Sequence, residues 1–121
     1  MANGLSCAVR RVHLLDKGHQ LRNSYADLDR LTASLAERSP EAADRLTARF
    51  FEALPRLEAF PLACGLAHES RDFPEEVRHL LFQIRKGRSY RALFIVRGDV
   101  VKVLCVRAPG ERPVGPGDVS A

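Results

Sequence analysis

The chain has 121 residues, of which 45% are apolar and 28% are charged, and its formal net charge is +4. This length predicts one domain, residues 1–121, with a single hydrophobic core, and the composition excludes a low-complexity or disordered protein. No apolar run approaches the roughly 18 residues of a membrane-spanning helix, and the N-terminal residues do not resemble a secretory signal. We therefore expect a cytoplasmic protein without membrane contact, with flexible ends at residues 1–6 and 110–121.

The cysteines and histidines do not show the spacing of a metal site. Cys7, Cys64 and Cys105 are odd in number and far apart, and they form no C-x-x-C pair. They predict neither a disulfide framework nor a zinc site. The histidines also lack metal-ligand spacing: His13, His19, His68 and His79. We expect no metal and no cofactor.

The first half of the chain predicts one strand and two helices. Residues 7–15 are the candidate for a first strand. From about His19, apolar residues at helical spacing predict an amphipathic helix that ends before Ser39. Ser39-Pro40-Glu41 then has the order of an N-cap, a proline in the first turn and a favourable acid, so a second helix starts there. Its apolar stripe is predicted to comprise Ala43, Leu46, Phe50, Leu54 and Leu57.

Two prolines limit this second helix. Pro55 has no N–H to donate and clashes with the preceding turn, so we expect a kink or a break there. A last turn reaches Phe60, before Pro61. Residues 61–74 are predicted to form a connecting loop.

Residues 77–107 contain three short apolar runs, VRHLLFQIRK, YRALFIVR and VVKVLCVR, separated by KGRS and by Gly98-Asp99. These runs predict a three-stranded antiparallel meander in which Gly87 and Gly98 take positive φ. The predicted register places Ala92 opposite Cys105 and Arg85 beside Arg91. The complete order, β-α-α-β-β-β, indicates an α+β fold with a helical hairpin packed on one face of a small antiparallel sheet.

The other face of this sheet is the candidate binding surface. The same 31 residues carry eight arginines or lysines against one acid, a net charge of +7 in a chain of +4, so an acidic partner is indicated. A partner-binding face is favoured over a face covered by the chain's own tail. The candidate partner-binding residues are Leu81, Gln83, Arg85, Arg91, Leu93, Ile95, Lys102 and Leu104, and Val106 is expected on the same face.

The segments ERSPEAADR, LEAFPLACGLAHES and EVRHLLFQIRKGRSYRALFIVRGDVVKVLCVRAPGER, in this order, resemble the RelE/ParE family of type II toxin–antitoxin toxins. The resemblance covers roughly residues 37–112. It implies the β-α-α-β-β-β fold, growth inhibition and plasmid stabilization, and a hetero-oligomer with a cognate antitoxin. That antitoxin lays an acidic or amphipathic segment across the toxin, and its short reading frame usually lies next to that of the toxin.

The family implies two targets. Ribosome-dependent RNases of the RelE branch use basic sheet residues, here Arg78, Arg85 and Arg91, together with a Tyr or His after the last strand. The sequence contains no Tyr or His after Tyr90, so mRNA cleavage is the alternative, and a ParE-like, non-enzymatic inhibition of DNA gyrase is favoured. A degenerate copy and a nucleic-acid-binding module remain open.

Four side chains near this surface have predicted roles. Arg85 and Arg91 are the expected antitoxin contacts. Glu69 either acts as a base or orients an arginine through an ion pair, and the ion pair is favoured. Cys105 is predicted to be a buried core residue.

Overall fold

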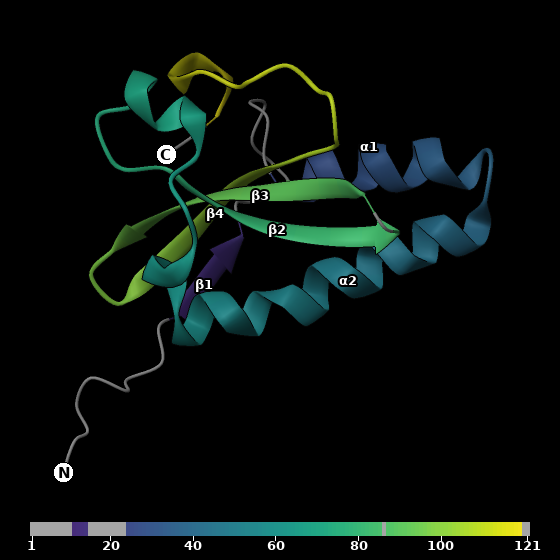
Figure 1. Cartoon of the computed structure of the whole chain (residues 1–121), viewed down its shortest axis with the longest axis horizontal. Coiled ribbons are helices and arrows are strands. Elements are labelled where there is room, and N and C mark those ends of the chain that lie inside the picture. The colour runs from purple at the N-terminus through teal and green to yellow at the C-terminus, as the bar shows by residue number, and fades with distance from the viewer. Residues whose placement is uncertain (1–10, 15–23, 86, 120–121) are drawn as a thin grey trace, which may run out of the picture.

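The computed structural model describes residues 11–14, 24–85 and 87–119, and it has the predicted α+β architecture (Figure 1). A hairpin of two helices packs on one face of a small sheet, and the chain order β-α-α-β-β-β is confirmed. The elements are β1 (Arg11–Leu14), α1 (Ser24–Ala36), α2 (Pro40–Ala59), β2 (Arg78–Arg85), β3 (Arg88–Arg97) and β4 (Val100–Arg107), with short 3-10 helices η2 (Pro61–Ala63), η3 (His68–Asp72) and η4 (Pro116–Asp118). The rest of the predicted first strand and residues 1–6 lie outside the described residues.

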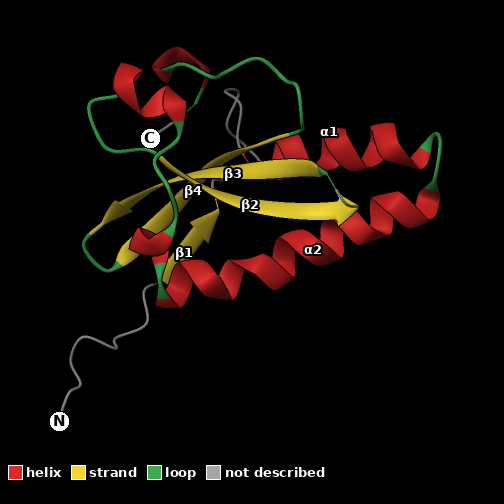
Figure 2. Cartoon of the chain, in the orientation of Figure 1, coloured by secondary structure: helices red, strands yellow, loops and turns green. Residues whose placement is uncertain are grey.

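The sheet has the strand order β1-β4-β3-β2 (Figure 2). β2, β3 and β4 form the predicted antiparallel meander, and β1 adds a short parallel strand beside β4. The two hairpin turns contain Gly87 at φ 85° and Gly98 at φ 59°, as expected, because only glycine takes such angles without strain. This order leaves β2 at one edge of the sheet, beside α2.

α2 starts where the sequence predicts. The Ser39 side chain accepts a hydrogen bond from the backbone N–H of Ala42 at 3.2 Å, and Pro40 is the first helical residue. Of the kink or break predicted at Pro55, the break is wrong, because α2 continues through Pro55 to Ala59, with Phe60 as its C-cap. Pro55 is exposed, so water can reach the carbonyl group that loses its helical partner, and the helix tolerates the proline.

The main core lies between the helical hairpin and one face of the sheet. α2 contributes the fully buried Leu46, Phe50 and Leu57, with Ala53 buried beside them and the predicted Leu54 half-buried against the same core. The sheet contributes an apolar layer of Leu80, Phe82, Tyr90, Ala92, Phe94, Val101, Val103 and Val106. Burial of these side chains holds the hairpin on the sheet.

A β-bulge corrects the predicted pairing of β3 with β4. Leu93 pairs with Cys105 and Phe94 with Val103, so Leu104 is an extra residue in β4. The bulge reverses the alternation beyond it. Cys105 is buried as expected, but it faces away from the helices, and Val106 takes the predicted place of Cys105 opposite Ala92.

The predicted pairing of β2 with β3 is displaced by four residues. Arg85 pairs with Arg88, so the connection is shorter than expected, and Arg91 pairs with Leu81. The displacement is an even number of residues, and therefore the predicted core side chains of β2 still face the helices. The predicted neighbourhood of Arg85 and Arg91 is wrong.

The second face of the sheet is covered by the chain itself. Residues 67–77 and 114–119 lie over it, on the side away from α2 (Figure 1). Together with β3 and β4 they form a second apolar cluster, which contains Ala67, Val77, Leu93, Ile95, Leu104, Cys105, Val114 and Val119. Two residues of the end predicted to be flexible, Val114 and Val119, are buried in this cluster. No helix in the described part of the chain combines the length and apolar character required to cross a membrane.

Candidate functional site

The structure separates the eight candidate partner-binding residues by exposure. Leu93, Ile95 and Leu104 are at most 1% exposed beneath the chain's own segments, which corrects the expectation of an open apolar face. Lys102 and Arg91 are half-buried. The exposed members all lie on the edge strand β2: Leu81, Gln83 and Arg85.

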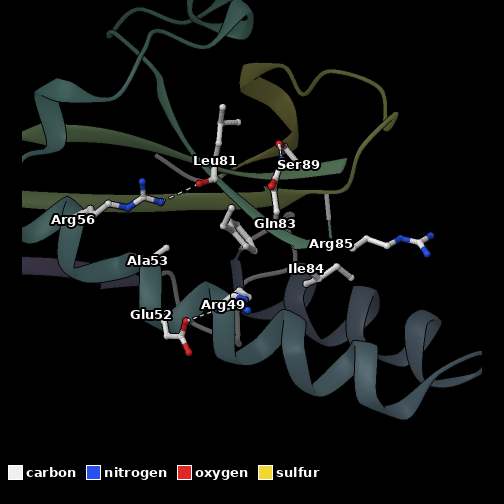
Figure 3. Close-up of a pocket in the computed structure, with 10 residues that line it drawn as sticks. Arg49, Glu52, Ala53, Arg56, Leu81, Gln83, Ile84, Arg85 and Ser89 are labelled. Atoms are coloured by element: carbon white, nitrogen blue, oxygen red, sulfur yellow. Dashed lines mark hydrogen bonds and ion pairs between the residues drawn. The ribbon is translucent and has the colours of Figure 1, made fainter. Parts of the chain in front are cut away.

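These three exposed residues line a groove between β2 and α2 (Figure 3). We call it the β2-edge groove. Its volume is about 720 Å³, and its lining residues are Arg49, Glu52, Ala53 and Arg56 from α2, Leu81, Phe82, Gln83, Ile84 and Arg85 from β2, and Ser89 from β3. Its position beside an edge strand makes both side chains and backbone groups accessible.

The groove is basic. Arg49 pairs with Glu52 at 3.1 Å, and Arg56 donates a hydrogen bond to the backbone oxygen of Leu81 at 3.0 Å. Arg85 is exposed and forms no ion pair with a described residue. Sequence reasoning missed Arg49 and Arg56, although their spacing of seven residues places them on the same face of α2.

The backbone of β2 is partly covered along its outer edge. The His79 N–H donates to the Gly65 oxygen at 3.1 Å, and the Leu81 oxygen accepts the bond from Arg56. Antiparallel pairing turns alternate residues outward, so Gln83 is the next position with outward backbone groups. Within the described parts of the chain, no side chain and no backbone group outside the sheet forms a hydrogen bond with the Gln83 backbone, which leaves a short strand edge open beside the basic groove.

Arg91 is held by Glu69 on the other face of the sheet. The guanidinium group donates to both carboxylate oxygens, at 2.9 and 2.7 Å, and also approaches Nδ1 of His79 at 3.5 Å. Glu69 is 1% exposed. Burial opposes its ionisation, but hydrogen bonds from Arg91 and the backbone lower the pKa of Glu69 to about 2. The predicted ion pair of Glu69 is therefore found. Its partner is Arg91, which the sequence predicted to contact the antitoxin instead.

The three arginines of the RNase hypothesis lie in different surroundings. Arg78 donates to the Cys64 oxygen at 2.6 Å and pairs with Glu76 at 3.2 Å. Arg91 faces the second side of the sheet, and Arg85 ends β2. Tyr90 is buried, and its ring stacks on Phe82. These guanidinium groups do not converge on one point where a phosphate could react.

No metal site accompanies these residues in the part that the structure describes. No group of three or more His, Cys, Asp and Glu side chains there is placed to hold an ion. The half-buried His79 lies beside Arg91, and burial together with that positive charge lowers the pKa of His79.

Comparison with protein families identifies the chain. The model of the family described as "ParE toxin of type II toxin-antitoxin system, parDE" matches residues 22–112. This match includes both helices and the whole meander, and the chain belongs to this family of type II toxins, which act with an antitoxin partner. No curated protein and no solved structure gives a match.

Proposed function

We propose that this type II toxin inhibits growth by binding DNA gyrase, and that its antitoxin neutralises it by occupying the β2-edge groove. The observation that carries the antitoxin part is the combination of basic side chains with an open strand edge in one groove. An acidic, amphipathic segment fits both features.

The groove offers three kinds of contact to such a segment. Arg49, Arg56 and Arg85 attract carboxylates, and Leu81 supplies exposed apolar surface. The outward backbone of Gln83 is available for a strand added to the sheet. Together these contacts give affinity through the backbone and selectivity for acidic side chains.

The surface also supports a protein target. The large apolar side chains that are exposed in the described part of the chain belong to α2, the segment after it and β2: Phe51, Phe60, Leu62, Leu66 and Leu81. Exposed apolar surface of this kind favours a protein partner. The separate positions of Arg78, Arg85 and Arg91 give no comparable support to mRNA cleavage.

The antitoxin part is tested with the product of the short reading frame next to the toxin gene. Its affinity for the wild-type toxin is compared with that for Arg85→Ala and for a matched control, Arg71→Ala. Arg71 is also exposed, but it lies on η3, outside the groove. We expect the Arg85 variant to bind about 5- to 150-fold more weakly, corresponding to about 1–3 kcal/mol for a charged contact, and the control to bind normally. Equal affinity of both variants and the wild type would contradict the proposed groove.

A further inference from the structure

A second pocket lies where the connection between α1 and α2 meets the turn between β2 and β3. Its volume is about 510 Å³. Its inner wall includes the apolar Leu31, Leu35 and Ile84, and its exposed rim carries four arginines, Arg38, Arg45, Arg85 and Arg88. We call it the arginine pocket.

The four guanidinium groups have no acidic partner within the described chain. None of them forms an ion pair there, although several other arginines, such as Arg30, Arg91 and Arg97, pair with glutamates. No described Asp or Glu lines the pocket either. Uncompensated positive charges gathered around one hollow create a potential that attracts a multiply charged anion.

Two uncharged features of the pocket also favour an anionic ligand. Ser39 and Ala42, at the start of the 20-residue helix α2, line the pocket, so the positive end of the helix dipole lies beside it. Tyr90 also lines it, and its hydroxyl has no hydrogen-bond partner among the described residues. The hydroxyl can therefore donate to a ligand oxygen.

The titration of Tyr90 is consistent with this arrangement. Burial raises the pKa of the phenol; the charges of Arg88, Arg38 and Arg85 lower it, and the charge of Glu111 raises it.

We propose that the arginine pocket binds the linked phosphoryl groups of an oligophosphate, as found in a free nucleoside triphosphate or in inorganic polyphosphate. Arginine forms paired hydrogen bonds with phosphate oxygens, and several guanidinium groups match several adjacent phosphoryl groups better than one isolated anion. The volume is within the range of small-molecule sites. The pocket shares Ile84 and Arg85 with the β2-edge groove, and its other lining residues lie outside that groove.

The direct test is calorimetric titration of the full chain with tripolyphosphate, ATP and sulfate, at two salt concentrations. We expect tripolyphosphate and ATP to bind at least tenfold more tightly than sulfate. Equal affinity for tripolyphosphate and ATP identifies the phosphoryl chain as the recognised group, whereas tighter binding of ATP identifies a nucleotide. Sulfate binding as tightly as tripolyphosphate would overturn the proposal, as would binding of a single-stranded oligonucleotide without any binding of tripolyphosphate.

Two variants that each lose two positive charges distinguish a specific binding site from nonspecific attraction between the basic protein and the anion. Arg38→Gln/Arg88→Gln removes two charges from the pocket, and Arg49→Gln/Arg71→Gln removes two charges elsewhere. We expect the first variant to lose at least tenfold in affinity for tripolyphosphate and the second to lose less than threefold. Equal losses would overturn the proposal.

A measurement on the wild-type chain covers the case in which a variant does not fold. Tripolyphosphate is titrated while backbone amide resonances are followed by NMR. We expect the largest shifts at Ala42 and Ala108, which line the pocket. Shifts concentrated at Leu81 and Gln83 instead would place the anion in the β2-edge groove and overturn the proposal.

Discussion

Replacing Glu69 by Gln tests how strongly the covering segment is held on the second face of the sheet. The substitution removes the charge that pairs with Arg91 but retains nearly the same shape. The pKa of Glu69 falls from an ordinary 4.5 to about 2 in the folded protein. Since one pKa unit corresponds to about 1.4 kcal/mol, ionised Glu69 stabilises the fold by about 3 kcal/mol at neutral pH.

The pH dependence has a defined sign. A carboxylate whose pKa is lowered by folding contributes its full stability above the unfolded pKa of 4.5, and this contribution is lost as the pH falls toward about 2. Between pH 7 and pH 3 the difference in unfolding free energy between wild type and Glu69→Gln is therefore expected to shrink, from about 3 to about 1 kcal/mol.

Urea unfolding followed by far-UV circular dichroism at the two pH values measures this difference. Glu58→Gln is a suitable control, because Glu58 lies on α2 and forms no ion pair within the described residues. A Glu69→Gln variant that is equally destabilised at pH 7 and pH 3 would show that shape or packing, and not the charge pair with Arg91, determines its stability.

Three further substitutions test how the elements are joined. Asp27 is buried on α1 and accepts a hydrogen bond from the β4 backbone at 2.9 Å, so Asp27→Ala is expected to cost about 1–3 kcal/mol in thermal unfolding, and the exposed Asp29→Ala much less. Removing the N-cap by Ser39→Ala should cost about 1 kcal/mol and lower the helical signal on heating. Gly98→Ala should cost about 1 kcal/mol because of its positive φ, whereas Gly117→Ala, which also has open space for a methyl group, should be nearly neutral by urea unfolding. Equal stabilities of Asp27→Ala and Asp29→Ala would refute the role of the Asp27 hydrogen bond. A Ser39→Ala variant as stable as the wild type would refute the N-cap, and equal stabilities of Gly98→Ala and Gly117→Ala would refute the strain at Gly98.

Local sequence signals were sufficient for most of the fold. The Ser39-Pro40 start of α2 and the turn at Gly98 each depend on the chemistry of a few adjacent residues, and both were predicted correctly. The predicted core face of β2 is also correct although its register is wrong, because a displacement by four residues, an even number, preserves the alternation of side chains.

The errors arose where distant segments decide the structure. Nothing near Leu104 in the sequence marks the bulge that turns Cys105 away from the helices. The cover over the second face depends on Val114 and Val119 packing against β3 and β4, and their proline- and glycine-rich surroundings resemble a flexible tail. The candidate site moved accordingly, from an open sheet face to the edge of β2.

Supercoiling by purified DNA gyrase in the presence of the purified toxin is the most direct measurement of the proposed target. We expect supercoiling to stop at toxin concentrations that leave cell-free translation and its mRNA intact, and added antitoxin to restore it. Unchanged gyrase activity together with mRNA cleavage on translating ribosomes would contradict the proposal and return Arg78, Arg85 and Arg91 to consideration as catalytic residues.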